Sequence, residues 1–438
     1  MSDIRIAQVI VDNKCKETDR LYSYIIPEDM EVEIGCRVIV PFGKSNKKVE
    51  GYVIEIKEDI DYDKERLKAI IKPAGSDVFL PPNMLKLIAW MRERYLCYYI
   101  EAIHSILPSN VRIKSTYYFE LNNDIRPLEL LKEGNPPILT EIVCFIEEKG
   151  GSVSWEELRD NFNDNVLDKA IRKLLKLGVL KRLQKLKKQE SIKYEKLIYP
   201  VDIKDIKISA NAKKQKLLYD LVLSNPGIEL SKVKKIYDIS QETVNSMLEK
   251  GYIRVEEEEV YRLVQEKLPV EERKILTNEQ IEAIKEIKKY FNEGYYVLLH
   301  GVTNSGKTEI YMNLIEEEIK KGKQGIVLVP EIALTPQMIR RFVSRFGDAV
   351  AVLHSGLSDG EKYDECRRIY QGKAKVVVGA RSAIFAPFNN LGIIIIDEEH
   401  ESTYKSETRP KYDAREVAIK RSQLEGANLL LGSATPSI

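Results

Sequence analysis

Residues 297–320 read VLLHGVTNSGKTEIYMNLIEEEIK, an apolar run, a glycine-rich turn and an amphipathic segment in direct succession. The turn, residues 301–308, matches the pattern G-x-x-x-x-G-K-[ST] in full. In this pattern backbone N–H groups turn toward phosphate oxygens, and the start of the following helix adds its partial positive charge. We therefore expect a strand at 297–300, a phosphate-binding loop, and a helix over 309–320.

Every residue of this loop is a candidate nucleotide contact. Lys307 is expected to reach the β and γ phosphates, and the Thr308 hydroxyl to ligate Mg²⁺. A chance match in an ordinary surface loop is the alternative, and the strand before the loop and the helix after it argue against that alternative. The predicted ATP-binding set in the loop is Gly301, Val302, Thr303, Asn304, Ser305, Gly306, Lys307 and Thr308.

Apolar runs recur through residues 265–438, and a polar loop follows each run. Continuous rather than alternating hydrophobicity is typical of strands that are buried on both faces of a parallel sheet and joined by helices. We therefore predict a parallel α/β domain over 265–438. The runs are YYVLLH (295–300), GIVLVP (325–330), VAVLHSG (350–356), KVVVGA (375–380), GIIIID (392–397) and NLLLGS (428–433).

Two of these strand ends carry reactive side chains. Asp397 and Glu398 follow four isoleucines, which suits Asp397 to hold Mg²⁺ and Glu398 to polarise an attacking water. Alone, such an acidic segment is equally compatible with a solvated loop. Small hydroxyl residues in GSATP (432–436) can hydrogen-bond the acidic loop and the γ-phosphate. Because open parallel sheets bind ligands at the carboxyl ends of their strands, we expect the three loops to meet, with His400, Ser433 and Thr435 coupling them.

Residues 1–112 contain short β-branched and aromatic runs separated by turn residues, such as IRIAQVIV (4–11) and CRVIVPFG (36–43). This spacing is typical of a small β-barrel or sandwich. Helical periodicity from Pro82 to His104 predicts a helix that caps the sheet.

An approximate repeat lies between the two β-containing parts. Residues 168–180 (DKAIRKLLKLGVL) align without gaps on 241–253 (QETVNSMLEKGYI), and each copy predicts a helix that ends at glycine before a hairpin. We predict two winged-helix-like modules, at 113–200 and 201–264. Residues 181–188 (KRLQKLKK) hold five basic residues and no acid, which fits either a phosphate-contacting edge or a solvated basic face.

The composition of the chain limits which partners and which cellular compartment are expected. A chain of 438 residues with 43% hydrophobic and 31% charged residues is folded and has several domains. Its net charge of +1 means that DNA would have to be held by local basic patches. Five widely spaced cysteines without a C-x-x-C pair, a charged N-terminus and apolar runs far shorter than a bilayer predict a cytoplasmic protein without a disulfide framework.

The motifs together resemble the first, RecA-like motor lobe of superfamily 2 DNA helicases, and specifically the family of primosomal replication-restart helicases. The N-terminal segment LYSYIIPEDMEVEIGCRVIVPFG (21–43) followed by LKAI (67–70) resembles that family's N-terminal domain, which is understood to bind the 3′ end of a nascent leading strand. The helical modules are matched only loosely. The motor motifs are GVTNSGKTEIY (301–311), LVPEIALTPQ (328–337), VLHSG (352–356), GARSAIFAPF (379–388), DEEH (397–400) and GSATPS (432–437).

The resemblance implies roles for individual residues. Lys307, Asp397 and Glu398 take the catalytic positions, and Gln280 the position of a glutamine that recognises adenine. Asn304 stands where the family usually has glycine, and Ser23 where some relatives have aspartate. The implied DNA contacts are Tyr22, Ser23, Tyr24 and Lys68 in the N-terminal domain, Thr335, Gln337, Arg381 and Ser382 at strand ends, and Tyr404, Lys405, Arg409, Tyr412 and Arg415 in an aromatic-rich loop.

The resemblance also implies an activity: an ATP- and Mg²⁺-dependent 3′ to 5′ DNA helicase that recognises stalled or branched forks and initiates primosome assembly. Forked or single-stranded DNA, primosome proteins and single-stranded-DNA-binding proteins are the implied partners. The family continues with a cysteine-rich zinc insertion, a second motor lobe with an arginine finger, and a further domain. The sequence stops at Ile438, so we expect this chain to lack the zinc cluster, to carry fork binding and half of the motor, and to be weakly active or inactive alone.

Two other functions are compatible with parts of the sequence. A DNA-binding fragment that holds nucleotide without hydrolysing it remains the main alternative. A P-loop kinase is disfavoured, because DEEH and GSATP would have no role in it.

Overall fold

The structure is a computed structural model of the 438-residue chain. It forms two compact units. The first comprises Met1–Gln189, Lys267–Asp359 and Cys366–Ile438, and the second comprises Glu190–Glu266 with Gly360–Glu365. The described residues are 5–58, 67–74, 80–107, 113–122, 135–188, 192–202, 208–209, 212–263, 275–302 and 305–436.

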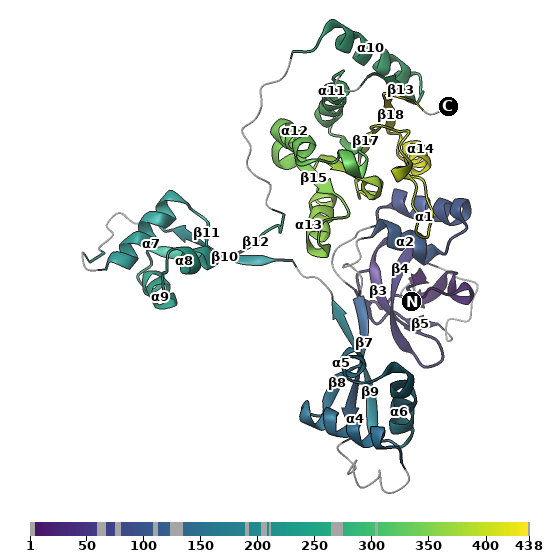
Figure 1. Cartoon of the computed structure of the whole chain (residues 1–438), viewed down its shortest axis with the longest axis vertical. Coiled ribbons are helices and arrows are strands. Elements are labelled where there is room, and N and C mark those ends of the chain that lie inside the picture. The colour runs from purple at the N-terminus through teal and green to yellow at the C-terminus, as the bar shows by residue number, and fades with distance from the viewer. Residues whose placement is uncertain are drawn as a thin grey trace. The chain divides into compact units, whose positions relative to one another are not determined.

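A mainly antiparallel sheet opens the first unit (Figure 1). Its described strands are ordered β5-β2-β1-β4-β3-β6, and β2 and β5 run parallel. Alternate residues of β1, among them Ala7, Val9 and Val11, enter one apolar core. The predicted β-rich N-terminal region is thereby confirmed. The strands are β1 (Ile6–Val11), β2 (Tyr22–Ile25), β3 (Arg37–Phe42), β4 (Lys47–Lys57), β5 (Lys68–Ala69) and β6 (Lys72–Pro73).

The segment predicted as one capping helix forms two helices, α1 (Pro82–Tyr95) and α2 (Tyr99–Ile106). Leu96 ends α1 in the left-handed region at φ +49°, which a helix interior cannot accommodate. The Glu101 carboxylate accepts the Tyr98 N–H at 3.0 Å and so caps the start of α2. Helix α1 packs against α14 (Ala414–Glu425) of the C-terminal sheet domain, inside the same compact unit.

Two small sheets with helices share one order of elements: strand, helix, short strand, helix, helix, strand. In each, the helix before the last strand is followed by a glycine, Gly178 at φ +72° and Gly251 at φ +71°, as the repeat predicts. The first set is β7 (Ile113–Leu121), α4 (Pro137–Glu148), β8 (Ser152–Ser154), α5 (Trp155–Asn161), α6 (Asp164–Lys176) and β9 (Leu180–Lys188). The second is β10 (Tyr194–Pro200), α7 (Lys213–Ser224), β11 (Ile228–Glu229), α8 (Leu230–Ile236), α9 (Gln241–Glu249) and β12 (Ile253–Glu259).

The boundary between these modules differs from the predicted one at residue 200. Strand β10 pairs with β12 along its whole length, from Tyr194 opposite Glu259 to Pro200 opposite Ile253. The second module therefore begins near residue 190, where the second unit begins. Pairing across so long a stretch leaves no local sign in the sequence. In the basic segment of β9, Lys181 is exposed, and the side chains of residues 184–188 lie outside the description.

The C-terminal part contains the predicted parallel sheet. Its described strands are ordered β13-β18-β17-β14-β16-β15, and every neighbouring pair runs parallel. The strands are β13 (Val297–His300), β14 (Gln324–Leu328), β15 (Val350–Leu353), β16 (Val376–Gly379), β17 (Leu391–Ile396) and β18 (Asn428–Ser433). The helices are α10 (Asn278–Asn292), α11 (Lys307–Lys320), α12 (Pro336–Phe346), α13 (Asp359–Tyr370) and α14.

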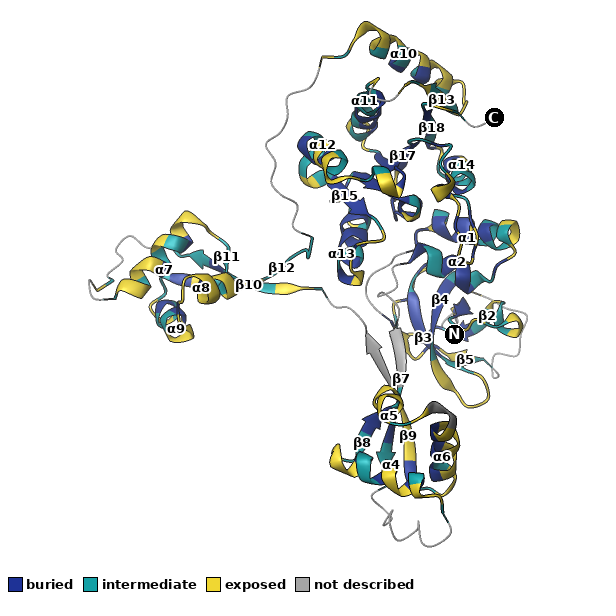
Figure 2. Ribbon diagram, viewed as in Figure 1, coloured by how far each residue is buried: buried dark blue, intermediate teal, exposed yellow. Residues whose placement is uncertain are grey.

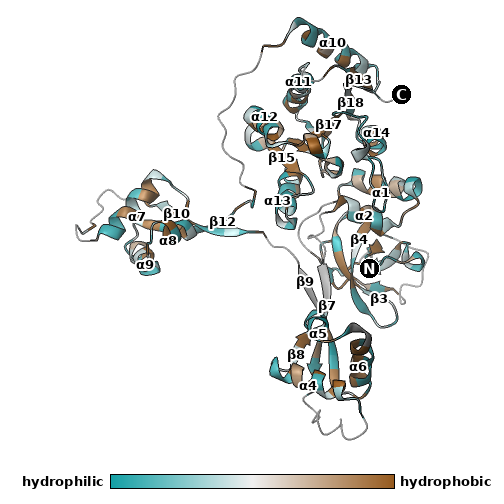
Figure 3. Ribbon diagram, viewed as in Figure 1, coloured by the Kyte–Doolittle hydropathy of each residue, from teal (hydrophilic) through white to brown (hydrophobic). Residues whose placement is uncertain are grey.

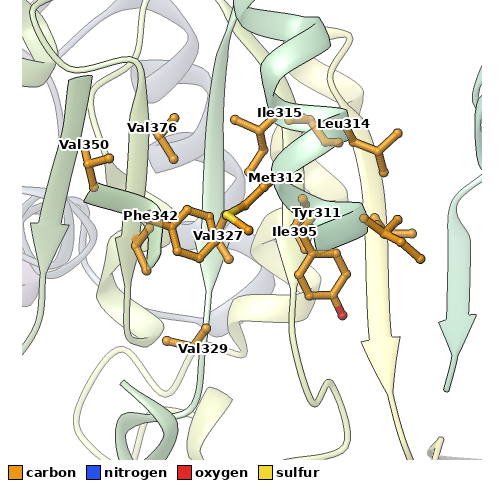
Figure 4. Packing of buried hydrophobic residues seen from close by; sticks show 14 of the residues in the cluster. Tyr311, Met312, Leu314, Ile315, Val327, Val329, Phe342, Val350, Val376 and Ile395 are labelled. Atoms are coloured by element: carbon orange, nitrogen blue, oxygen red, sulfur yellow. The ribbon is translucent and has the colours of Figure 1, made fainter. Parts of the chain in front are cut away.

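Burial differs between strands of this sheet. The inner strands β14, β16 and β17 are buried along their length, whereas the edge strand β13 alternates between half-buried and exposed residues (Figure 2). Strand β17 is also among the hydrophobic ribbons (Figure 3). Tyr311 and Met312 of α11 and Phe342 of α12 pack with strand residues in the core (Figure 4). Because the strands are parallel, the loops after β13, β17 and β18 leave from one edge of the sheet.

Candidate functional site

The phosphate-loop motif lies between the end of β13 at His300 and the start of α11 at Lys307. Gly306 precedes the helix at φ +87°, a left-handed conformation that favours glycine. A Cβ atom at Gly306 would collide with the amide nitrogen of Gln280. The turn therefore brings backbone close to neighbouring groups, as a phosphate cradle requires.

The other residues predicted to bind ATP in this loop differ in their exposure. Thr303 and Asn304 lie outside the described residues. Val302 is 71% exposed, and its carbonyl accepts the Ser305 N–H at 3.1 Å. Thr308 is half-buried in the first turn of α11, with its hydroxyl on the same helix end as the loop.

Gln280 joins helix α10 to this loop. Its Oε1 accepts the Thr277 N–H at 3.0 Å in a capping box, and its Nε2 donates to the Ser305 carbonyl at 3.4 Å. The structure thus places the glutamine expected to recognise adenine against the phosphate loop.

Lys307 is 8% exposed and lies between the loop and the acidic segment. Its Nζ donates to the Gly301 carbonyl at 2.6 Å and lies 3.5 Å from Glu398 Oε1. A buried ammonium needs nearby oxygens to offset its lost hydration. The Lys307 ammonium group is therefore held between the phosphate loop and the Glu398 carboxylate.

Asp397 follows β17, and two buried tyrosines fix it. The Tyr311 hydroxyl donates to Asp397 Oδ1 at 2.8 Å, and the Tyr404 hydroxyl donates to the Asp397 carbonyl at 2.6 Å. Burial raises the pKa of the Asp397 carboxyl, and the hydrogen bond from Tyr311 opposes that rise. A nearby divalent cation would favour the ionised form.

Glu398 adopts a left-handed backbone at φ +45°, which is uncommon for a residue with a side chain. Its Oε2 accepts the Ala434 N–H at 3.2 Å, while its Oε1 faces Lys307. The strained turn therefore aims one carboxylate at both the phosphate loop and the segment after β18.

The three residues predicted to couple the loops lie together. His400 Nδ1 is 2.8 Å from the Ser433 Oγ, and its Nε2 is 3.3 Å from the Thr435 hydroxyl. Ser433 is completely buried, and its Oγ also accepts the Thr435 N–H at 3.1 Å. The acidic segment and the GSATP segment thus form one hydrogen-bonded network.

The residues at this edge suit Mg²⁺. A hydroxyl at the helix start, Thr308, and a buried carboxylate, Asp397, are the oxygen donors that a magnesium-nucleotide site uses. Tyr311 holds that carboxylate without itself carrying charge. Gly432 leaves room beside it, because a Cβ there would collide with the Tyr311 hydroxyl and lie 3.3 Å from Asp397 Oδ1.

Some of the strand-end residues implied to contact DNA have exposed side chains, and others are hydrogen-bonded within the chain. Thr335 caps α12 by accepting the Met338 N–H, with Pro336 in the first turn. Gln337 and Ser382 are exposed.

Arg381 instead holds the following loop. Its Nη1 donates to the Lys405 carbonyl at 2.6 Å and to the Thr403 carbonyl at 3.3 Å.

Two of the tyrosines implied as DNA contacts in the aromatic-rich loop are buried. Tyr404 is 1% exposed beneath Asp397, and Tyr412 is 6% exposed with its ring 5.0 Å from that of Phe385. Their aromatic character serves packing, which sequence alone does not distinguish from stacking. Lys405 and Arg409 are the exposed cations among the predicted residues of this loop.

Arg415 also has partners within the chain. It clamps Asp413 through Nε at 2.9 Å and Nη2 at 2.6 Å, and its Nη1 donates to the Glu399 carbonyl at 2.9 Å. Arg415 therefore holds the backbone of the acidic segment 397–400 through the Glu399 carbonyl.

The predicted DNA-end pocket in the N-terminal sheet is divided between two faces. Tyr22 and Tyr24 point toward the core, and Ser23 pairs on the other face with Gln8 at 3.0 Å. Tyr24 is 4% exposed, and burial raises its pKa to about 12. The ring of Tyr24 therefore lies in the apolar core of the sheet.

Two of these residues nevertheless approach the same strand end. Lys68 lies opposite Tyr24 in the parallel pair of β5 and β2. The exposed Lys68 donates to the Gly43 carbonyl at 2.7 Å, and the Tyr24 hydroxyl to the Pro41 carbonyl at 3.3 Å.

The sequence did not point to the hydrogen bond of Tyr311 to the Asp397 carboxylate, nor to that of Tyr404 to the Asp397 carbonyl. One signal was available for Tyr311: it lies four residues after Lys307 and so shares its helix face.

Among the described residues there is no group of three or more His, Cys, Asp or Glu side chains arranged for a metal ion. Within the same part of the chain, none of the helices is long and apolar enough to cross a bilayer.

Two family models match the chain. Residues 8–108 match the 3′DNA-binding domain of PriA, and residues 277–438 match the DEAD/DEAH box helicase. The second match agrees with the helicase-type parallel motor domain described above.

Curated relatives match almost the whole chain. A replication restart protein PriA from Bacillus subtilis is 38% identical over 99% of this chain and 54% of its own length. Proteins of the same name from Synechocystis and Haemophilus influenzae are 36% and 32% identical, covering 99% and 96% of this chain and 52% and 48% of their lengths. The chain therefore spans about half the length of these relatives. The solved structure of RecG bound to a three-way DNA junction is 24% identical over 51% of this chain and 27% of its own, with a TM-score of 0.29.

Proposed function

We propose that this chain, which belongs to the PriA family of replication restart proteins, is the ATP-binding and DNA-end-binding part of a 3′ to 5′ DNA helicase that acts at stalled forks. One observation carries the proposal. Lys307 of the phosphate loop faces Glu398, and the segment from 433 to 435 binds Glu398 and His400. A nucleotide phosphate at Lys307 would touch a network that spans three strand ends.

Each residue contributes separately to the proposed hydrolysis. Lys307 meets phosphate charge, and Glu398 orients the attacking water from its fixed turn. Mg²⁺, held by Thr308 and Asp397, would neutralise charge that develops on the phosphates. Loss of the γ-phosphate would free Lys307 and Glu398 to re-form their pair, and His400 would pass that change to Ser433 and Thr435.

The DNA-binding part of the proposal rests on the N-terminal sheet and the exposed strand-end residues. Ser23 and Lys68 would contact the terminal nucleotide, and Gln337, Ser382 and Lys405 the strand backbone. We interpret the two repeated modules as winged-helix-like. Primosome proteins and single-stranded-DNA-binding proteins in the cytoplasm are the proposed partners.

A protein that binds nucleotide and DNA without hydrolysis is the second candidate, because an arginine finger would have to complete this site for fast turnover. ATP turnover by the chain, with and without forked DNA, separates the two. We expect slow turnover that forked DNA increases and that Glu398→Gln abolishes. Glu317→Gln, which removes an exposed carboxylate of α11, is the control. Full nucleotide and DNA binding without turnover would favour the second candidate.

A further inference from the structure

The last turn of helix α1 contacts the start of helix α14. Arg94 forms a two-point contact with Glu416, from Nη2 to Oε1 at 2.6 Å and from Nε to Oε2 at 3.2 Å. The Tyr95 hydroxyl donates to the same Oε2 at 2.9 Å. Glu416 therefore has two partners, both on the N-terminal domain's helix.

From there the contacts continue to the ATP site. The Asp413 N–H donates to the Tyr95 oxygen at 3.4 Å, and Asp413 is the residue that Arg415 clamps. Arg415 then donates to the carbonyl of Glu399 at 2.9 Å. That carbonyl directly follows the left-handed turn at Glu398, so Arg415 restrains the backbone that aims the catalytic carboxylate.

The same end of α1 also contacts the segment that leads into β2, the strand proposed to hold the DNA end. Asp19 Oδ2 accepts from Arg92 Nε at 3.0 Å, and its Oδ1 accepts the Tyr99 N–H at 2.7 Å. Asp19 thus ties the end of α1 to the start of α2. The next residue, Arg20, lies over the Tyr22 ring at 5.1 Å, at the beginning of β2.

We propose that Arg94 and Tyr95 are positioning residues that make nucleotide affinity depend on whether the N-terminal domain holds a DNA 3′ end. Occupancy of β2 would shift the segment around Asp19, and with it the end of α1. Tyr95 would transmit that shift through Asp413 and Arg415 to the Glu399 carbonyl. This inference rests on the proposed function, because it assumes that the chain binds both ligands.

The contacts are suited to positioning more than to stability. The Arg94 and Glu416 side chains are 55% and 37% exposed, and exposed ion pairs contribute little to folding. The directed hydrogen bond of Tyr95 instead specifies one arrangement of the two helices. Its loss would change the coupling while leaving each domain folded.

The test measures nucleotide affinity of the whole chain with and without DNA. The probes are a fluorescent non-hydrolysable ATP analogue with Mg²⁺ and a fork whose nascent strand ends in a 3′-hydroxyl or a 3′-phosphate. We expect the 3′-hydroxyl fork to change the nucleotide Kd of the unmodified chain about fivefold or more. Tyr95→Phe and Glu416→Gln should each reduce that change below about twofold, and the double variant should reduce it no further.

Two matched controls should keep the full change. Glu317→Gln removes an exposed carboxylate paired with Lys288, and Tyr290→Phe removes an exposed hydroxyl of α10. Thermal stability and the nucleotide Kd without DNA should stay unchanged in all variants, which a merely structural role of Tyr95 would not permit.

The outcomes separate this inference from the proposed function. If the unmodified chain binds both ligands without a change in Kd, or if Tyr95→Phe and Glu416→Gln keep the full change, the inference is wrong. If the unmodified chain fails to bind nucleotide or fork, the proposed function is wrong and the inference fails with it.

Discussion

The N-terminal sheet and the C-terminal sheet place their predicted functional residues in opposite ways. In the C-terminal sheet, residues far apart in sequence, Lys307, Glu398 and Ser433, meet at one edge. In the N-terminal sheet, the adjacent residues Ser23 and Tyr24 lie on opposite faces.

Strand geometry explains the difference. The carboxyl ends of parallel strands meet at one edge, so separate strand-end motifs predict one site. Successive side chains along any strand alternate between its two faces. In a continuous motif such as YSY (22–24), the two tyrosines therefore lie on one face and the serine on the other. In the C-terminal sheet, the order of the motifs along the chain therefore predicts which side chains lie together. In the N-terminal sheet, residues that are neighbours in the sequence do not share one site.

The largest expected effect tests the core role of Tyr24. Tyr24→Ala should lower local stability of the N-terminal sheet by about 3 to 4 kcal/mol, because it empties a buried aromatic site. Amide hydrogen exchange of β1 and β2 measures this loss. Ser23→Ala is the matched control and should cost about 1 kcal/mol or less, while weakening the preference for a 3′-hydroxyl over a 3′-phosphate end. Equal destabilisation by both variants would contradict the division of faces.

The next effect tests the separation of the two sheets. Lys307→Ala should weaken Mg·ATP binding about 100-fold, close to 2.7 kcal/mol, because phosphate charge loses its buried cation. Fork affinity in a salt-matched titration should change less than about twofold. Lys320→Ala, at the exposed end of the same helix, is the control. An equal loss of DNA affinity would show that the two sites are not separate.

Gly432→Ala tests how closely the motor edge is packed. The new Cβ would strike the Tyr311 hydroxyl, so we expect about 1 to 2 kcal/mol of destabilisation in chemical unfolding and weaker nucleotide binding. In a Tyr311→Phe background the nearest atom is absent, and the loss should shrink. The same loss in both backgrounds would mean that Tyr311 is not the obstacle.

The smallest effect sharpens the role of Tyr311. Tyr311→Phe removes the donor to Asp397 and should weaken Mg²⁺-dependent nucleotide binding about fivefold, near 1 kcal/mol. That hydrogen bond lowers the Asp397 pKa against the effect of burial, so its loss should raise the pKa further. Binding by the variant should therefore fail at a higher pH than binding by the unmodified chain as pH is lowered. Titrations of nucleotide affinity between pH 5 and 8 measure this difference, and superimposable profiles would count against it.

Much of the motor lobe could be predicted because its signals are local. Four isoleucines before Asp397 specify a buried strand and its end, and Thr335 before Pro336 specifies a helix start. The glycines after α6 and α9 likewise marked helix ends, because a left-handed residue there favours glycine.

Other features depended on contacts that no local pattern encodes. The burial of Tyr404 and Tyr412 depends on which segments cover them, and an aromatic residue suits a core as well as a base. The start of the second module at β10 likewise came from strand pairing between residues far apart in the chain.

The sequence by itself determined the phosphate loop, the order of buried strands and the residue types at their ends, because backbone conformation and hydrophobic periodicity are encoded within a few residues. Only the tertiary structure decided which of those side chains face a ligand and which are buried or paired. Tyr311 on Asp397, Arg415 on the Glu399 carbonyl and Tyr95 on Glu416 are contacts between elements up to 321 residues apart. Such contacts depend on how sheets and helices pack, which is a property of the whole chain.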